Sequence, residues 1–327
     1  MRKFIGCLTL FLIVALVASL TFNIIQLGAS QQLEIPNFEE TLLGGDASSK
    51  DKIAVINLYG VISYSTPGEV YETAIDDFVG KLKQVRDDDS IKAVIIRMDS
   101  PGGEVTASDV LYHHVVETNA KKPVVIYMES VAASGAYYTA VGGEYIMANE
   151  LTITASIGVI MQAINYQSLA DKIGVSVLTF KSGELKDLLN PMRPVTEKEK
   201  ALVQGLINET YDKFVGIVAK ERHLDEAKLR SGSADGRILS GKQALKDGLI
   251  DGTGYFENAI SKAIELSHAD KKSAVVNLEA PYSFSRIFRA LGESHAAGSR
   301  VSVEIGPKQL ELQTGKLYYI SSHLFGK

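Results

Sequence analysis

Ser134 lies within a stretch of small residues, 128–138, which reads Met-Glu-Ser-Val-Ala-Ala-Ser-Gly-Ala-Tyr-Tyr. Residues 123–127 before it are apolar and rich in β-branched side chains, as in a buried parallel strand, and residues 132–141 can form a helix. A serine where a strand passes into a helix can present its hydroxyl at a sheet edge, near backbone N–H groups that could hold an oxyanion. Serine is also common at helix starts as a cap or a small packing residue. We interpret Ser134 as a candidate nucleophile that needs support from other parts of the chain.

Two further segments could supply the rest of such a site. Residues 99–103 read Asp-Ser-Pro-Gly-Gly between a predicted strand and a predicted helix, and Gly102 and Gly103 allow backbone angles that turn N–H groups toward a ligand. An ordinary turn is the alternative for this loop. Residues 180–187 read Phe-Lys-Ser-Gly-Glu-Leu-Lys-Asp and include Lys186. Lysines are mostly solvated surface charges, and a lysine acts as a general base only when burial lowers its pKa toward 7 or 8.

A histidine base is the obvious competitor, because serine nucleophiles are often activated by histidine. The chain has six histidines, and none of them lies in a comparably patterned loop. The sequence holds no metal-binding spacing of the His-Glu-x-x-His kind and no phosphate-binding glycine motif, so we predict no metal and no cofactor. The only cysteine is Cys7, which excludes an intrachain disulfide. With 34 basic and 39 acidic residues the net charge is −5 and the basic residues are scattered, so we predict no nucleic-acid partner.

The N-terminus carries the clearest local signal. Arg2 and Lys3 precede residues 4–25, which carry no charge and are long enough to cross a hydrocarbon core of about 30 Å. This pattern predicts a single-pass membrane anchor over residues 1–30, with a cytoplasmic N-terminus and an extracytoplasmic remainder. A cleavable signal peptide is the alternative. Residues 31–51 are polar with Gly-Gly and Ser-Ser pairs, which predicts a flexible stalk with little structure.

Residues 52–267 alternate strand and helix patterns, which predicts an α/β domain built from βαβ units. The predicted strands are 52–62, 91–98, 123–128, 144–147, 157–161 and 175–180. The predicted helices are 70–85, 106–118, the helix after Ser134, 166–173, 196–222, 240–249 and 255–266. Segments 99–104 and 148–156 are predicted to be loops.

Residues 268–327 are more polar and weakly periodic, and we interpret them as a C-terminal tail. Two short strand candidates, 301–305 and 317–320, interrupt it. The second, Leu-Tyr-Tyr-Ile, could lie in a peptide groove as an added strand and restrain activity. A tail that packs elsewhere is the alternative.

Together these segments resemble the signal peptide peptidase A family of bacterial membrane serine peptidases, in its short form with one catalytic domain. The resemblance covers about residues 52–267. It lies in the loop 99–103, in Ala-Ala-Ser-Gly at 132–135 with the tyrosines 137 and 138, in Ser-Ile-Gly-Val at 156–159, in Lys-Ser-Gly at 181–183 with 186–187, and in glycine 241 with 243–244 and 248–251. The fold of this family is similar to the Clp protease and crotonase folds, with a repeated ββα core.

The resemblance implies a Ser/Lys dyad with Ser134 as nucleophile and Lys186 as general base. It implies an oxyanion hole from backbone N–H groups near Gly102, Gly103 and Gly135. It also implies a homo-oligomeric ring in which neighbouring protomers complete each site, acting outside the cytoplasmic membrane on remnant signal peptides and other unfolded or membrane-derived peptides.

This sequence departs from many relatives where Glu104, Ala136 and Ala155 replace glycines, which could narrow the groove or alter its preferences. Two other functions are open at this point. One is a non-catalytic membrane scaffold of the same fold that binds peptides or partner proteins, and the other is a crotonase-like acyl-CoA enzyme. The presence of both Ser134 and Lys186 argues against each.

Overall fold

The computed structural model describes residues 11–22, 38–64, 74–280 and 317–320 of the chain. It divides into two units, Met1–Asn37 and Phe38–Lys327. In the first unit, residues 11–22 are helical. The predicted membrane span over 4–25 is therefore described only in part, and within the described ranges no helix is long and apolar enough to cross a membrane.

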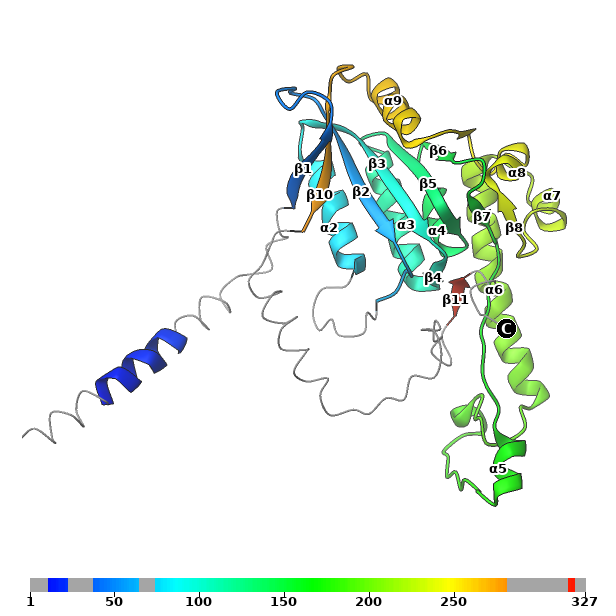
Figure 1. Cartoon of the computed structure of the whole chain (residues 1–327). Coiled ribbons are helices and arrows are strands. Elements are labelled where there is room, and N and C mark those ends of the chain that lie inside the picture. Colours follow the sequence, from blue (N-terminus) through cyan, green and yellow to red (C-terminus); the bar gives the residue numbers. More distant parts are fainter. Residues whose placement is uncertain (1–10, 23–37, 65–73, 281–316, 321–327) are drawn as a thin grey trace, which may run out of the picture. The chain divides into compact units, whose positions relative to one another are not determined.

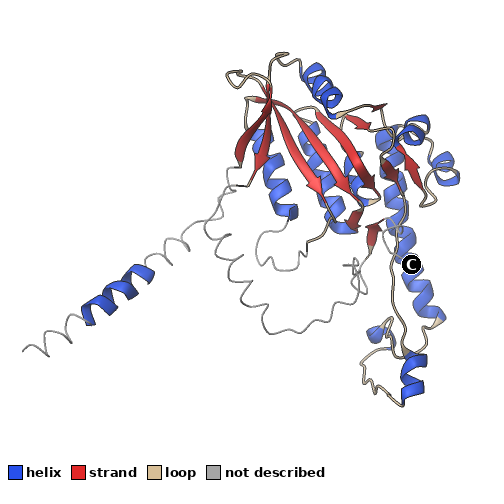
Figure 2. Cartoon of the chain, viewed as in Figure 1, coloured by secondary structure: helices blue, strands red, loops and turns tan. Residues whose placement is uncertain are grey.

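The second unit is built on a mostly parallel sheet of nine strands, shown in Figures 1 and 2. The order is β1-β10-β2-β3-β5-β6-β9, with β7 paired to β5 and β8 paired to β7. The strands are β1 (Glu39–Gly44), β2 (Lys52–Tyr59), β3 (Ile91–Ser100), β5 (Val124–Ala133), β6 (Tyr145–Ala148), β7 (Ile153–Ala155), β8 (Ile238–Ser240), β9 (Gly252–Thr253) and β10 (Ala274–Glu279). Only the β1–β10 and β7–β8 pairs of this sheet are antiparallel. The predicted mixed α/β fold with a mainly parallel sheet is confirmed.

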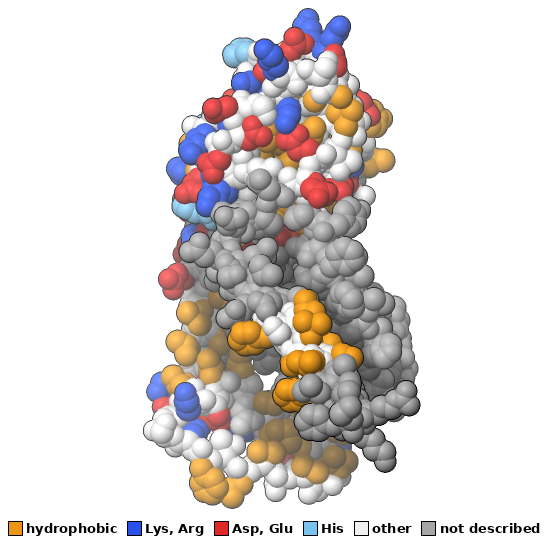
Figure 3. All heavy atoms as spheres, turned by 90° about the vertical axis from the view of Figure 1, so that its left-hand side faces the viewer, with side chains coloured by type: hydrophobic (Ala, Val, Ile, Leu, Met, Phe, Trp, Pro, Cys, Tyr) orange, Lys and Arg blue, Asp and Glu red, His pale blue; other side chains and the backbone are white. Residues whose placement is uncertain are grey.

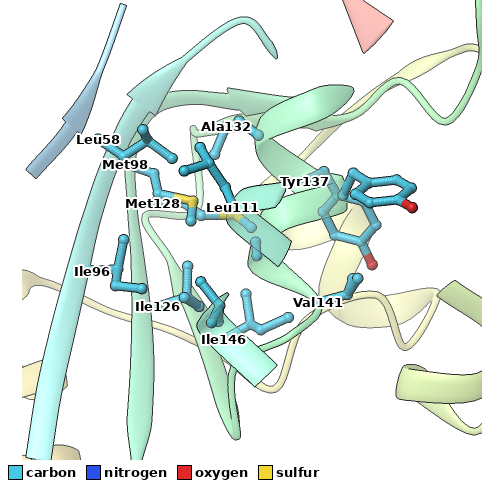
Figure 4. Close-up of a cluster of buried hydrophobic side chains, with 14 of the residues drawn as sticks. Leu58, Ile96, Met98, Leu111, Ile126, Met128, Ala132, Tyr137, Val141 and Ile146 are labelled. Carbon is cyan, nitrogen blue, oxygen red and sulfur yellow. The ribbon is translucent and has the colours of Figure 1, made fainter. Parts of the chain in front are cut away.

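Helices cover both faces of the sheet because β2, β3 and β5 are apolar on both faces. Ile56, Ile96 and Ile126 belong to the larger buried cluster, on the face that carries α2 (Ala74–Asp87), α3 (Val105–Asn119) and α4 (Gly135–Ala140). The alternate residues Val55, Ile95 and Val125 pack instead with α9 (Phe256–Ser267). Figure 4 shows part of the larger cluster, where side chains of β3, β5 and α3 meet. The ends of β3 and β5 are thereby fixed side by side.

The 26-residue helix α6 (Glu197–Arg222) leaves the body of the unit and carries an arm at its N-terminal end (Figure 1). We call residues 160–196 the arm; it holds α5 (Gln167–Ile173) and the 3₁₀ turn η1 (Glu184–Asp187). Phe214, Val215 and Val218 of α6 are buried against the body, while Leu202 and Leu206 near its start are exposed. Only the C-terminal half of α6 is therefore anchored in the core.

The remaining helices follow α6 in the chain. They are α7 (Glu226–Ser231) and α8 (Gly241–Lys246). The long helix was predicted at 196–222, and Thr196 caps it in a capping box in which its side chain accepts from the Glu199 N–H. The prediction of α6 is confirmed to within a residue.

Several local predictions differ from the structure. Segment 99–104 is not all loop, because β3 runs to Ser100 and a short strand, β4 (Gly102–Glu104), follows. The strand predicted at 157–161 is wrong: strand β7 lies in the segment 148–156 predicted as loop, and Ile160 makes only an isolated bridge. Segment 175–180 is β-branched but is not a strand, because it lies on the exposed arm without a neighbouring strand.

The sheet also extends past the limits expected from the sequence. β1 lies within the predicted stalk, and β10 lies beyond the predicted end of the domain near residue 267. β10 inserts between β1 and β2, in parallel with β2. The strand candidate at 301–305 lies outside the described residues, whereas 317–320 contains strand β11 (Tyr318–Ile320), as expected.

Candidate active site

Ser134 occupies a strained junction between β5 and α4. Its backbone angles are φ 56° and ψ −115°, a combination that costs a non-glycine residue about 1 to 3 kcal/mol. Two hydrogen bonds hold it there: its N–H donates to the Ala155 carbonyl at 2.7 Å, and its carbonyl accepts from the Tyr138 N–H at 2.8 Å. The side chain is fully buried, and its Oγ has no hydrogen-bond partner among the described residues. A buried hydroxyl without a hydrogen-bond partner costs stability and calls for an explanation, and a catalytic role is one such explanation.

Three glycine backbones converge next to Ser134. Gly102 has φ +96°, and a Cβ placed on it would lie 2.6 Å from the Gly135 nitrogen. A Cβ on Gly135 would lie 2.4 Å from Ser108 Oγ and 3.1 Å from the Gly103 nitrogen. These positions favour glycine, because a Cβ on Gly102 would overlap the Tyr319 carbonyl oxygen and one on Gly135 would overlap Ser108 Oγ. The structure thus brings the glycine loop and the serine stretch together, as the sequence led us to expect.

Strand β11 of the C-terminal tail lies beside these glycines. It pairs antiparallel with β4, so that Tyr318 lies opposite Glu104 and Tyr319 opposite Gly103. On its other side, Tyr318 exchanges two backbone hydrogen bonds of 3.1 Å with Ile160. Because N–H and C=O groups alternate in direction along a strand, those of Tyr319 face Gly103.

The Tyr319 carbonyl oxygen lies among these glycines. It is 3.1 Å from the point that a Cβ of Gly135 would occupy, the same distance as the Gly103 nitrogen. It is also 2.2 Å from the point that a Cβ of Gly102 would occupy. An extended peptide in this groove therefore directs a carbonyl toward the glycine N–H groups beside Ser134.

The Tyr319 side chain fills an aromatic pocket. Its ring stacks on Tyr138 with a centroid distance of 5.0 Å, lies 4.6 Å from the Phe214 ring, and its hydroxyl donates to the Thr210 carbonyl at 3.1 Å. Burial raises the pKa of both Tyr319 and Tyr138 above the usual value, so both phenols are neutral. Sequence reasoning did not identify Phe214 and Thr210 as pocket residues, because the apolar stripe of α6 indicated only a core-facing helix.

Lys186 lies far from Ser134 within one chain. It is exposed on η1, in the arm, and the turn is tied to Glu199 in the first turn of α6. Ser134 lies near Phe214 of the same helix, through Tyr138 of α4. Glu199 and Phe214 are separated by fifteen residues of α6, or about 22 Å along the helix axis. The arrangement of one chain therefore does not bring the predicted dyad together.

Among the described residues, one group could hold a metal ion: His113, His114 and Glu117 near the end of α3. A ring nitrogen of each histidine lies within 3.3 Å of a carboxylate oxygen of Glu117. The group has no visible connection with the candidate site.

A strained serine at a strand end, backbone N–H groups beside it and an extended segment paired with β4 together fit the class of serine peptidases. Comparison with known proteins agrees with that class. Residues 117–270 match peptidase family S49.

Three relatives illustrate the match. A protein of Methanocaldococcus jannaschii named as a protease is 42% identical over 198 residues, 61% of this chain and 63% of the relative. A protein of Enterococcus faecium named as a signal peptide peptidase A is 36% identical over 226 residues, 68% of this chain and 65% of the relative. A protein of Synechocystis named as a protease is 39% identical over 223 residues, 68% of this chain and 77% of the relative. The chain thus spans just under two thirds of the first two relatives.

The chain belongs to peptidase family S49. The identification as a member of the signal peptide peptidase A family, and with it the class of serine peptidase, is confirmed at the level of the family.

Proposed function

We propose that this protein is a serine endopeptidase in which Ser134 is the nucleophile and Lys186 of a neighbouring protomer is the general base. The oxyanion hole is formed by the backbone N–H groups of Gly103 and Gly135, because the N–H of Gly102, which was also expected there, donates to Ser100 Oγ at 3.2 Å. The observation that carries this proposal is the strand β11, which lies in the groove with the carbonyl of Tyr319 beside these glycines. The strand acts as a stand-in for an extended substrate.

The chemistry is acyl transfer from a peptide to serine and then to water. The neutral Lys186 amine takes the proton of Ser134 Oγ as Oγ bonds to the substrate carbonyl carbon, and the oxyanion accepts hydrogen bonds from the glycine N–H groups. Collapse of this intermediate breaks the C–N bond, and the lysine proton passes to the departing amine. The neutral Lys186 amine then deprotonates a water molecule, which attacks the acyl carbon. Ser134 Oγ leaves with the proton that Lys186 returns to it.

The partner that supplies Lys186 is a second copy of this chain. The separation of about 22 Å along α6 argues against a contact within one protomer. The arm also exposes large apolar side chains, among them Leu178 at 80% and Phe180 at 88%, and Leu202 of α6 continues this surface. Figure 3 shows hydrophobic side chains at the lower end of the molecule, where the arm lies. Burying them against the next protomer in a head-to-tail ring would bring η1 to a neighbour's groove.

The groove accepts a single extended strand between β4 and Ile160, which suits unfolded peptides better than folded proteins. Remnant signal peptides and other membrane-derived peptides are the substrates that we propose. A single anchor within residues 1–30, with the catalytic domain outside the cytoplasmic membrane, would place the enzyme beside such peptides. The fold that we propose for the domain is of the Clp protease and crotonase type.

A fluorophosphonate probe tests the nucleophile. The full-length protein should be labelled once per chain, and Ser134→Ala should abolish both labelling and cleavage of a fluorogenic peptide. Ser261→Ala removes an exposed hydroxyl of α9 and serves as the matched control, with unchanged labelling. Labelling that survives in Ser134→Ala would refute the proposed nucleophile.

Lysine variants test the base. Lys186→Ala should abolish turnover, whereas Lys172→Ala, on α5 of the same arm, should not. A Lys186→Ala protein that turns over peptide normally would exclude the dyad. Peptide binding without cleavage by the wild-type protein would favour the scaffold, and a CoA-dependent reaction without peptide cleavage would favour the acyl-CoA enzyme.

A further inference from the structure

Arg193 lies at the centre of a charged cluster that joins η1 of the arm to the first turn of α6. Its Nε and Nη2 donate to the two carboxylate oxygens of Asp187, each at 2.9 Å, and Nη2 also donates to the Asp187 carbonyl at 2.9 Å. Its Nη1 and Nη2 donate to the two oxygens of Glu199 at 2.9 and 2.6 Å. We call Asp187, Arg193 and Glu199 the arm clamp. It joins the residue next to Lys186 to the first turn of α6.

The clamp is shielded from solvent more than an ordinary surface ion pair. The side chain of Glu199 is 1% exposed and that of Asp187 is 12% exposed. Hydrogen bonds from Arg193 hold the pKa of Asp187 below its usual value and lower that of Glu199 to about 2. Both carboxylates are therefore charged at neutral pH, and planar guanidinium is the group that can bind two carboxylates side by side.

Other contacts hold the arm less completely. Lys181 donates to Asp187 at 2.6 Å and to the Glu184 carbonyl at 3.0 Å, but both of these partners lie on η1 itself. Lys198 of α6 reaches Glu184 at 2.5 Å, with both side chains at least 60% exposed, so that solvent screens the pair. Of these three cations, Arg193 alone makes a shielded connection between η1 and α6.

We infer that Arg193 is a positioning residue for catalysis: through Asp187 and Glu199 it fixes the turn that carries Lys186 on the end of α6. This inference rests on the proposed role of Lys186. The arm has few other constraints, since most of its side chains are exposed. A base on such a segment would reach a neighbour's Ser134 in many orientations, and a misplacement of about 1 Å can cost about 100-fold in rate.

The test is a set of Arg193 variants in the full-length protein. Arg193→Gln should lower kcat by about 10- to 100-fold with little change in KM, because the groove is formed by β4 and Ile160 and not by the arm clamp. Arg193→Lys keeps the charge but cannot bind both carboxylates side by side, so its kcat should fall between those of the wild type and Arg193→Gln. The matched control is Arg230→Gln, which removes exposed ion pairs to Glu226 and Asp212 and should leave kcat unchanged.

A double-mutant cycle separates positioning from general stability. If Arg193 acts through Lys186, then Arg193→Gln should slow the fluorophosphonate labelling of Ser134 in the wild-type background, but it should cause no further slowing, over long incubation, in Lys186→Ala, whose peptide turnover is already abolished. Further slowing of the same size in that background, or a normal kcat for Arg193→Gln, would overturn the inference.

Two further controls keep the outcomes distinct. Size-exclusion chromatography with light scattering should show that Arg193→Gln forms the same assembly as the wild type. If Arg193→Gln does not assemble, the kcat of Arg193→Lys is measured instead. A kcat of Arg193→Lys equal to that of the wild type would then refute the inference. If the proposed function is wrong, the result is different: Lys186→Ala then keeps full activity, independently of the result for the Arg193 variants.

Discussion

Co-expression of two inactive variants tests whether each active site is shared between protomers. Ser134→Ala keeps its lysine and Lys186→Ala keeps its serine. If every site takes its serine from one chain and its lysine from the next, random assembly of equal amounts restores both groups in about a quarter of the sites. The distance of about 22 Å between the regions of α6 that adjoin the two residues is the structural reason to expect this result.

In the assay, each of the two variants carries a different affinity tag, and mixed assemblies are purified through both tags in succession. The rate of hydrolysis of a fluorogenic peptide is then measured per chain. Ser134→Ala with Lys186→Ala should give about a quarter of the wild-type rate, whereas each variant alone should give none. Co-expression of the wild type with the double variant Ser134→Ala/Lys186→Ala provides the matched control. It should also give about a quarter if sites are shared, but about a half if each chain holds a complete site.

Two results would refute the reasoning. The first is no activity from the two single variants together, provided that they form mixed assemblies of normal size. The second is half of the wild-type rate in the control. Either result would mean that the arm folds back onto its own chain, contrary to the extension of α6 away from the body.

Three further changes test the groove, the tail and the clamp. Gly102→Ala should lower kcat by about 100- to 1,000-fold, because its Cβ would lie 2.6 Å from the Gly135 nitrogen of the proposed oxyanion hole. Gly60→Ala is the control and should retain activity, because Gly60 has a similar φ of +76° but its Cβ would have no atom within 4 Å. Tyr319→Ala empties the aromatic pocket and should raise the hydrolysis rate of short peptides if the tail restrains activity; an unchanged rate would dispose of that idea. Because the pKa of Glu199 is lowered, its ionised carboxylate stabilises the folded arm fully above pH 4.5, and this stabilisation is lost as the pH falls toward 2. Hydrogen exchange of the arm should therefore increase over that pH range. The increase should be smaller in Glu199→Gln.

The fold and the position of the serine could be predicted because they depend on local patterns. Long apolar runs identified β3 and β5, and neighbouring parallel strands place their carboxyl ends together, which brought the loop before Gly103 next to Ser134. Segment 175–180 has the same β-branched character and was wrongly predicted as a strand. Composition indicates only the β propensity of a segment, whereas a strand also needs a neighbouring strand to pair with. Segment 175–180 has no such neighbour on the arm.

The groove itself could be predicted only in part. The short tail strand was expected from its apolar and aromatic residues, but its partners Gly103 and Ile160 lie more than 150 residues away along the chain. Ile160 was assigned to a strand of its own, because nothing in the sequence indicates that its hydrogen-bonding groups face the tail. Nor does the sequence reveal the clamp, since Arg193 and Glu199 resemble ordinary surface charges until α6 and η1 fix their distance.

The two halves of the candidate site are supported by different forces. Ser134 is fixed by backbone hydrogen bonds and by a packed apolar core, which suits a residue held in strained geometry but leaves its Oγ without a partner among the described residues. Lys186 is carried by a segment with little core, where orientation depends on the charges of the arm clamp. A lysine packed into the core beside the serine would bear the full cost of burying its charge during folding. In the proposed assembly, a lysine on an exposed arm bears that cost only when protomers associate, and burial of apolar surface such as Phe180 would offset it.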